Sequence, residues 1–174
     1  MTALTPPDPA RHDELAAMLT EYADDFPHGS GLWNVPQRLR ADRDAQAMRS
    51  FARLLQHLAD PATTYLDDTV PSWYFWLVDE AGELVGFLAF RHRLNPWLWE
   101  QGGHVGYSVR PARRREGHAR RALGLAVRRA PELGIDRVLV TCDDDNLASA
   151  GTIEANAGVL QDVRAGMRRY WITP

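Results

Sequence analysis

The spacing of apolar residues predicts two helices in the first third of the chain. The first covers residues 9–25, where Pro9 suits the opening position of a helix. The second covers residues 36–59, and Pro61 is expected to end it. Their apolar faces consist of Leu15, Met18, Leu19 and Tyr22 in the first helix and of Met48, Phe51, Leu55 and Leu58 in the second. The breaker-rich residues 27–34 separate the two helices as a loop.

After residue 70 the pattern changes to the short apolar runs that are typical of strands. Strands are expected at residues 72–78, 84–90, 103–110, 135–142, 159–163 and 167–172, with a further one near Ala3. Helices are expected at residues 117–133, ending at Gly134, and at residues 146–156. The stretch 94–101 shows no regular pattern. No repeat or long linker divides the chain, so its 174 residues are predicted to form one α/β domain, 1–174.

The most informative stretch joins the predicted strand that ends near Val109 to the helix that follows. It reads Arg114-x-x-Gly117-x-Ala119 and lies within a cluster of arginines. Backbone N–H groups at a helix N-terminus point outward, and the helix dipole favours an anion there. Gly117 has no Cβ to keep the backbone away from a ligand. The pattern predicts a binding loop for a pyrophosphate group, against the alternative of a solvated basic loop.

The residues that define this junction are Val109, Pro111, Arg114, Gly117 and Ala119. In this order and spacing they resemble motif A of the GNAT superfamily of N-acetyltransferases. The resemblance covers residues 73–172 and implies a mixed, mostly antiparallel central sheet flanked by helices. It also implies a splay between the fourth and fifth strands, which end at Val109 and Cys142. In that fold the pantetheine arm of acetyl-CoA pairs with the strand edge exposed by the splay.

The resemblance assigns a role to each region of the domain. The core, residues 72–172, would bind acetyl-CoA as cosubstrate, and the helical N-terminal region, residues 1–70, would shape the acceptor side. The expected cofactor-binding residues of the loop are Val109, Arg114, Arg115, Gly117, His118 and Ala119. Asn146 and Ser149 match the family's Asn-x-x-Ser pattern, in which the asparagine contacts the pantetheine or nearby backbone. The alternative for Asn146 is to cap the helix that begins there.

His104 lies five residues before Val109, at an offset where several family members carry a glutamate that accepts the proton of the substrate amine. Its ordinary pKa of about 6.5 suits a general base. Strand alternation places it on one face with Gly106 and Ser108, whose small side chains would leave room for a ligand. The prediction is a catalytic general base, and the alternative is a hydrogen-bonded structural histidine.

One position departs from the family pattern. Many members carry a tyrosine seven residues after the motif asparagine, as general acid toward the leaving thiolate, whereas this chain has Ile153. Residues 146–158 are more similar to a branch of uncharacterised predicted acetyltransferases that reads Asn-x-x-Ser-x-x-x-Ile-Glu-x-Asn-x-Gly. In such a branch we expect water or the departing ammonium to protonate the thiolate.

Two loops are candidates for the wall of an acceptor pocket. Residues 91–104 are dense in polar and aromatic groups between two strands, and Trp33 lies with His28 and Asn34 in the first interhelical loop. The alternative for residues 91–104 is a packed surface connection. The aromatic residues expected to pack in the core and the sheet instead are Trp73, Phe75 and Trp76.

Composition narrows the classes of function. The net charge of −3 argues against a nucleic-acid partner, because it provides no broad phosphate footprint. Cys142 is the only cysteine, which excludes an intrachain disulfide and fits a reducing, cytoplasmic compartment. Asp143, Asp144 and Asp145 are expected to form a solvated turn, so no metal site is predicted. No segment approaches the length of a membrane span, so no membrane association is expected.

These observations predict an acetyl-CoA-dependent N-acetyltransferase. A primary amine of a small molecule or a peptide would attack the thioester directly in a ternary complex. A backbone N–H of residues 105–109 would stabilise the oxyanion, and Cys142 would form no acyl-enzyme. The alternatives are a non-catalytic module that binds or senses acyl-CoA and a transferase for a longer acyl group. The identity of the acceptor stays open, and so does a homodimer.

Overall fold

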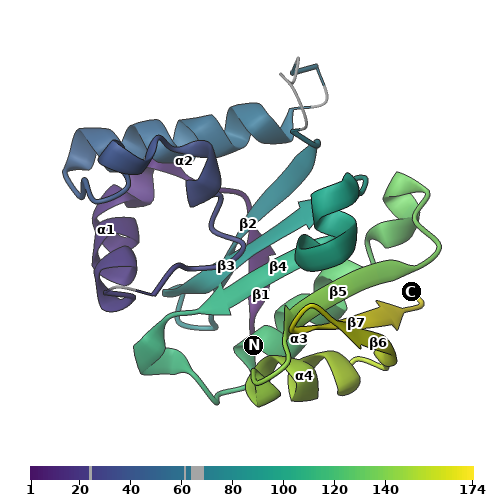
Figure 1. The fold of residues 1–174 in the computed structure, drawn as a ribbon. Coiled ribbons are helices and arrows are strands. Elements are labelled where there is room, and N and C mark those ends of the chain that lie inside the picture. Colours follow the sequence, from purple (N-terminus) through teal and green to yellow (C-terminus); the bar gives the residue numbers. More distant parts are fainter. Residues whose placement is uncertain (24, 61, 64–68) are drawn as a thin grey trace.

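Two antiparallel sheets form the centre of the computed structural model, which describes residues 1–23, 25–60, 62–63 and 69–174. The first sheet has the order β1-β2-β3-β4 and the second has the order β5-β7-β6 (Figure 1). The strands of the first sheet are Ala3–Thr5 (β1), Ser72–Val78 (β2), Leu84–Arg91 (β3) and Val105–Val109 (β4). Those of the second are Val138–Asp143 (β5), Val159–Arg164 (β6) and Met167–Ile172 (β7). The predicted α/β class and the strand near Ala3 are confirmed.

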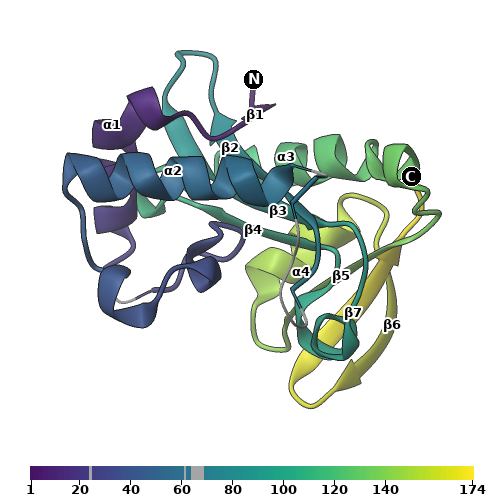
Figure 2. The same cartoon turned by 90° about the horizontal axis from the view of Figure 1, so that it is seen from above.

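Helices cover both faces of the first sheet (Figures 1 and 2). The helices on one face are α1 (His12–Glu21) and α2 (Ala45–Ala59), and α3 (His118–Val127) lies on the other. The fourth helix, α4 (Leu147–Glu154), lies beside α3 and β5. No helix among the described residues combines the length and hydropathy needed to cross a membrane.

Alternate side chains of β2 and β3 fill the two cores. Trp76 and Phe87 pack under α1 and α2, whereas Phe75 and Leu88 face α3. Trp76 is 1 % exposed and Phe75 is 9 % exposed, and Trp73 packs against the same core as Phe75. The predicted core and sheet packing of these aromatic residues is therefore confirmed.

The first two helices are shorter than predicted. Residues Pro9–Arg11 form a separate 3-10 turn before α1, which ends at Glu21. The second helix begins at Ala45 and not at residue 36, because the carboxylate of Asp44 accepts a hydrogen bond from the Ala47 N–H at 2.8 Å and caps it there. Asp24, within the predicted first helix, and Pro61, the predicted end of the second, lie outside the described residues.

The helix predicted for residues 117–133 is also shorter. Its α-helical segment ends at Val127, and Ala130–Leu133 form a 3-10 turn that closes at Gly134 with φ +67°. Pro131 explains the change, because it has no N–H to donate and its ring collides with the preceding helical turn. The stretch predicted to be irregular contains a π-helical turn, Leu98–Gly102 (η4).

The two sheets are joined by backbone hydrogen bonding at one end of β4 and β5. The N–H of His104 donates to the Leu139 carbonyl at 2.7 Å, but β4 and β5 share no ladder beyond this point. Gly103 permits this close approach, since a Cβ there would lie 2.6 Å from the Leu139 oxygen. The predicted splay between the fourth and fifth strands is therefore present, and His104 stands at its closed end.

Candidate functional site

The edge of β4 that faces β5 carries backbone groups without ladder partners. On the other edge, Arg91 N–H donates to His104 O and Arg110 N–H donates to Val85 O, which sets the alternation of the β3–β4 ladder. The residues whose N–H and C=O groups consequently point toward β5 are Val105, Tyr107 and Val109. Across the described residues none of them forms a backbone hydrogen bond to β5. Such an edge can pair with an extended ligand as an added strand.

Beyond this edge, the loop before α3 presents a series of unsatisfied N–H groups. Arg115 and Gly117 have positive φ, +68° and +83°, which turns successive amides toward the same side. The first helical bond of α3 is donated by Arg121 to the Gly117 carbonyl at 3.1 Å. From Arg115 to Arg120, no backbone N–H finds an acceptor among the described residues. These donors and the helix dipole make the loop suitable for an anion.

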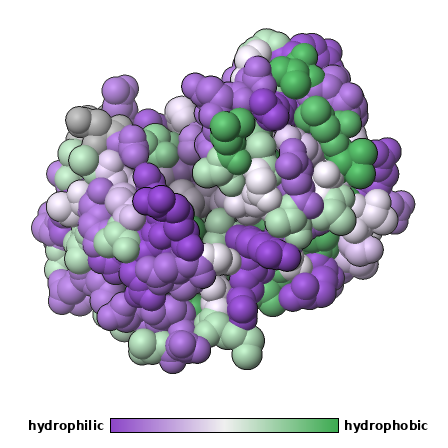
Figure 3. Space-filling view, turned by 90° about the horizontal axis from the view of Figure 1, so that it is seen from below, coloured by the Kyte–Doolittle hydropathy of each residue, from purple (hydrophilic) through white to green (hydrophobic). Residues whose placement is uncertain are grey.

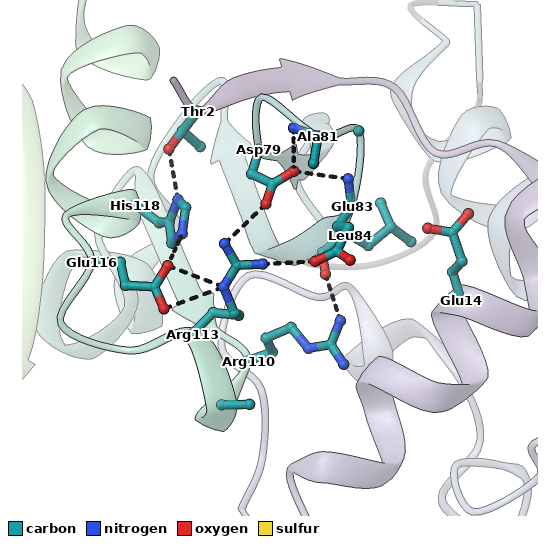
Figure 4. A network of polar contacts seen from close by, with 12 residues as sticks. Thr2, Glu14, Asp79, Ala81, Glu83, Leu84, Arg110, Arg113, Glu116 and His118 are labelled. Atoms are coloured by element: carbon teal, nitrogen blue, oxygen red, sulfur yellow. Dashed lines mark hydrogen bonds and ion pairs between the residues drawn. The ribbon is translucent and has the colours of Figure 1, made fainter.

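A network of ion pairs anchors this loop to the rest of the domain (Figure 4). Arg113 contacts the carboxylates of Asp79 at 2.9 Å, Glu83 at 2.8 Å and Glu116 at 3.0 Å. Its hydrogen bond to Glu116 raises the pKa of Arg113 and lowers that of Glu116, with the Asp79 bond raising the Arg113 pKa further. Arg113 is therefore a structural anchor between the β2–β3 turn and the loop.

His118 belongs to the same network. Its Nε2 lies 3.2 Å from the Glu116 carboxylate and its Nδ1 lies 2.8 Å from the Thr2 hydroxyl (Figure 4). Both ring nitrogens of this buried side chain are thus engaged within the protein. Only the backbone N–H of His118 remains available to a ligand, so the predicted cofactor contact of this residue is limited to its main chain.

In the part of the chain that the structure describes, some of the other arginines near this loop form ion pairs with carboxylates, and others form none. Arg110 forms an ion pair with Glu21 that ties the end of β4 to α1. The Nε of Arg114 donates to the Val109 carbonyl at 3.3 Å, and its guanidinium lies 3.6 Å from Asp25 on the surface. Within the described residues, the arginines near the loop that form no ion pair are Arg115, Arg120, Arg121 and Arg128. These four arginines supply the positive charge around the loop.

A cavity of about 630 Å³ extends from this loop along α3. Among the residues that line it are Gly117, Arg120, Arg121, Gly124, Arg128 and Asn156. The Nδ2 of Asn156 donates to the Arg120 carbonyl at 3.1 Å, so α3 and the end of α4 are joined at the cavity wall. Arg120, Arg121 and Arg128 give the α3 wall a positive charge that suits an anionic ligand, and the carboxylates of Asp79, Glu80 and Glu116 also line the cavity.

Asn146 caps α4, as the alternative interpretation expected. Its Oδ1 accepts a hydrogen bond from the Ser149 N–H at 3.0 Å. Its Nδ2 group has no acceptor among the described residues and remains able to donate to a ligand. The cap and the predicted cofactor contact are therefore compatible in this geometry.

A hydroxyl pair spans the distance from β4 to α4. The Tyr107 Oη lies 2.9 Å from the Ser149 Oγ. Burial raises the pKa of Tyr107 to about 12, so its phenol remains protonated at neutral pH. Cys142 lies next to this pair, and burial raises the pKa of its thiol. Ser149 thus lies beside the splay, and its predicted contact with the cofactor stays a prediction; the sequence pattern does not single out Tyr107.

His104 is a structural element of the splay in this geometry. The Leu139 N–H donates to its Nδ1 at 2.9 Å, so a neutral ring carries its proton on Nε2 and has no free lone pair. Burial, together with the nearby charge of Arg91, lowers the pKa of His104 to about 4. These contacts do not support the hypothesis that His104 is a general base. The hypothesis assumed that His104 alternates with Gly106 and Ser108 in one strand, but His104 precedes β4 and its side chain reaches β5 instead.

The space predicted beside Gly106 and Ser108 is occupied by the first interhelical loop. A Cβ on Gly29 would lie 2.2 Å from the Gly106 carbonyl oxygen, so backbone packs directly on backbone. The Ser108 Oγ donates to the His28 carbonyl at 2.8 Å and holds the loop in place. The loop 27–34 therefore forms a wall over β4 at Gly106 and Ser108.

Other predicted lining residues have mixed positions. Trp33 is 61 % exposed and packs against Phe26, whereas Asn34 points inward and donates to the Tyr74 hydroxyl at 2.9 Å. In the stretch 91–104, Trp97 and Trp99 are largely exposed.

The surface is hollowed between the half that carries α1 and α2 and the half that carries β5 to β7 (Figure 3).

The remaining positions considered are the three consecutive aspartates and Ile153. Among the described residues no group of three potential ligands could hold a metal ion. Asp143, Asp144 and Asp145 are exposed, and Asp144 pairs with Arg168 at 2.8 Å. Ile153 is fully buried in the core under α4, where the family pattern would place a tyrosine.

Sequence and structure comparisons identify the family. The model of the acetyltransferase (GNAT) family matches residues 15–158. The chain belongs to the GNAT family. No curated protein matches it significantly.

Solved structures with the same fold include several acetyltransferases. The microcin C7 self-immunity acetyltransferase MccE, in complex with acetyl-CoA and AMP, aligns with a TM-score of 0.64 and 13% identity over 99% of this chain and 92% of the other. RimL, a ribosomal L7/L12 alpha-N-protein acetyltransferase in complex with coenzyme A, gives 0.67 and 14% over 99% and 93%. The acetyltransferase from Salmonella typhimurium that modifies the N-terminal serine of L7/L12 gives 0.67 and 14% over 99% and 95%. At this identity the likeness shows the shared fold.

Two residues near the splay escaped the sequence analysis. Tyr107 lies within the predicted strand 103–110 and Arg91 at the start of the polar and aromatic stretch 91–104, and the sequence pattern singles out neither. Their significance depends on contacts with Ser149 and with Gly102, which lie on other elements. An arginine at the end of an otherwise apolar strand is the one local signal that could have directed attention to Arg91.

Proposed function

We propose that the protein transfers an acetyl group from acetyl-CoA to a primary amine. The observation that carries this proposal is the continuity of two donor surfaces: the open edge of β4 leads directly into the loop of unsatisfied N–H groups before α3. A pantetheine arm along the strand edge would bring a pyrophosphate to Arg115–Arg120. The acetyl-CoA and CoA bound to the structural neighbours support the same ligand.

The residues of the loop fit this ligand by shape as well as by charge. A Cβ on Gly117 would meet nothing within 4 Å, so the space in front of the amides is open. Arg115, Arg120 and Arg121 would compensate the phosphate charge. The Nδ2 of Asn146 is placed at the start of α4 to donate to the pantetheine arm.

The reaction is direct transfer within a ternary complex. The amine nitrogen forms a bond to the thioester carbonyl carbon, the C–S bond breaks, and CoA leaves as a thiolate. The N–H groups of Val105 and Tyr107, which point away from β3, would stabilise the oxyanion that forms on the carbonyl. Holding both substrates in one site supplies much of the rate acceleration.

Proton transfer in this proposal involves no histidine. His104 is neutral and has no free lone pair, so we assign no general base to it. The proton released by the amine passes to water and the thiolate gains one in return. Tyr107 and Ser149 remain protonated hydroxyls beside the splay; one of them donates within the pair, and the other would donate a hydrogen bond to the thiolate.

Calorimetry with acetyl-CoA and an assay of free-thiol release with a panel of primary amines test the proposal. We expect binding, and thiol release that depends on the amine. Binding without turnover of any amine would indicate a non-catalytic acyl-CoA module. Faster turnover of propionyl-CoA or butyryl-CoA would indicate a transferase for longer acyl groups. A protein that does not bind acetyl-CoA would contradict the proposal.

A further inference from the structure

The guanidinium of Arg91 lies where three segments meet. Arg91 is the last residue of β3, and its Nη1 donates to the carbonyls of Gly102 at 2.8 Å and Gly103 at 3.2 Å. Its Nη2 and Nη1 lie 3.2 and 3.4 Å from the point where a Cβ on Gly106 would stand. The guanidinium therefore covers the middle of β4 on the face opposite α3.

A second donor converges on the same point. The backbone nitrogen of Gly29, from the loop over β4, lies 3.4 Å from that Cβ position. Its N–H has no hydrogen-bond acceptor among the described residues. A cation and an amide thus both pack against Gly106, and two such donors close together favour an anion beside them.

Over the described ranges of the chain, Arg91 pairs with no carboxylate, unlike two other arginines that are partly or fully buried. The side chains of Arg110 and Arg169 are 21 % and 1 % exposed, and each pairs with a carboxylate, Glu21 and Asp162 respectively. No carboxylate of the described residues lies within 4 Å of Arg91. Burial lowers its pKa, and its charge contributes to the low pKa of His104. A partly buried cation that has carbonyl acceptors but no counter-ion is stabilised further by a ligand that supplies negative charge.

We propose that Arg91 binds a carboxylate of the acceptor, so that the substrates are small primary amines carrying a carboxylate, such as amino acids. This inference rests on the proposed function. The planar fork of a guanidinium matches a carboxylate with two parallel hydrogen bonds, and its Nε and Nη2 have no acceptor among the described residues. Gly106 lies between Val105 and Tyr107, so the carboxylate would be held next to the strand edge where the acetyl group is proposed to lie.

The test compares L-amino acids with their C-terminal carboxamides in the thiol-release assay. The wild-type protein should prefer the free carboxylates. Arg91→Gln should raise KM for the carboxylates and lower their kcat/KM by roughly 10- to 100-fold, the range for losing a charged hydrogen-bonded contact. The kcat/KM for the carboxamides should fall by much less. Arg91→Lys, which keeps the charge but not the fork, should lie between the two.

Two further variants separate binding from folding. Arg93→Gln removes an exposed arginine two residues away, whose Nη2 contacts only the Thr69 carbonyl among the described residues at 3.3 Å, and should change neither substrate class. Gly106→Ala keeps Arg91 but places a methyl group against its guanidinium, and should weaken carboxylate substrates selectively if it folds. Equal turnover of carboxylates and carboxamides by the wild type, or equal losses for both in Arg91→Gln, would overturn the proposal.

A direct measurement of amino-acid binding separates the role of Arg91 from the proposed acetyl-transfer function. Calorimetry of the preferred amino acid is carried out on the protein alone and on the protein saturated with CoA. Loss of acetyl-CoA binding contradicts the proposed function, whereas amino-acid binding that is unaffected by Arg91→Gln contradicts the role of Arg91. Preference for phosphorylated amines over carboxylates would also overturn the assignment.

Discussion

His104 and Leu139 are joined by two hydrogen bonds at the closed end of the splay. The His104 N–H donates to the Leu139 carbonyl at 2.7 Å, and the Leu139 N–H donates to the His104 Nδ1 at 2.9 Å. The imidazole thus completes a pairing that a backbone carbonyl would make in a continuous sheet. Beyond this point β4 and β5 share no ladder, so this side chain helps to determine where the cleft begins.

Replacing His104 should therefore affect stability before catalysis. His104→Ala leaves the buried Leu139 N–H without an acceptor, which should cost about 1–3 kcal/mol in the free energy of unfolding, with a further loss from the cavity. His104→Asn places an amide oxygen near the position of Nδ1 and should recover much of this stability. Denaturant titration measures both. If His104 were the general base, His104→Asn would be folded but inactive, so retained turnover in this variant distinguishes the two roles.

The same residue should make stability depend on pH. Burial, with the charge of Arg91, lowers the pKa of His104 to about 4 from the ordinary value of 6.5. Between these values the unfolded chain binds the proton first, so the free energy of unfolding falls as the pH drops through this window. At pH 5 the contribution lost is about 2 kcal/mol relative to neutral pH. His104→Asn should lose correspondingly less stability between pH 7 and pH 5, and parallel losses in both proteins would contradict this pKa.

Gly117→Val should abolish the binding of CoA while the fold persists. Nothing lies within 4 Å of a Cβ at this position, so the side chain would occupy the space proposed for the phosphates. Because φ is +83°, the substitution also costs stability. Gly166→Val is the matched control, since Gly166 has φ +78°, equally open surroundings and a place in the β6–β7 turn. Calorimetry that finds the same CoA affinity in both folded variants would remove the loop from the site.

Asn146→Ala should weaken CoA binding and lower stability together. Loss of the cap costs about 1 kcal/mol of stability, and loss of one hydrogen bond to the pantetheine would cost about as much in affinity. Asp44→Ala removes the comparable cap of α2, where the carboxylate accepts from the Ala47 N–H, and should reduce stability alone. Melting curves and calorimetry on both variants measure the two effects. An Asn146→Ala protein with normal CoA affinity would leave only the capping role.

Cys142→Ala should retain most of the turnover. Burial raises the pKa of the Cys142 thiol, so little thiolate is present to attack a thioester at neutral pH. Initial-rate kinetics should be sequential in both proteins, as direct attack by the amine requires. An acetylated Cys142 detected by mass spectrometry, formed and consumed as fast as the overall reaction, would replace direct attack with a two-step mechanism.

The sequence by itself determined the features that depend on near neighbours in the chain. The anion loop was predictable because Gly117, the following helix start and the arginines around it lie within a few residues of each other. The succession of strands along the chain and the aromatic core followed from local periodicity, since alternate residues of a strand necessarily face opposite sides. The helix ends were less accurate, because Asp44 and Pro131 act through capping and steric effects that the apolar pattern does not contain.

Only the tertiary structure decided what His104, Tyr107 and Arg91 do. His104 meets Leu139, and Tyr107 meets Ser149, across the splay, and both pairs come from elements separated by the whole of α3. The Gly29 amide packs against Gly106 only because the first interhelical loop folds over β4. The pKa and the hydrogen-bonding capacity of a side chain are set by such distant neighbours and by burial, and spacing along the chain carries no record of either.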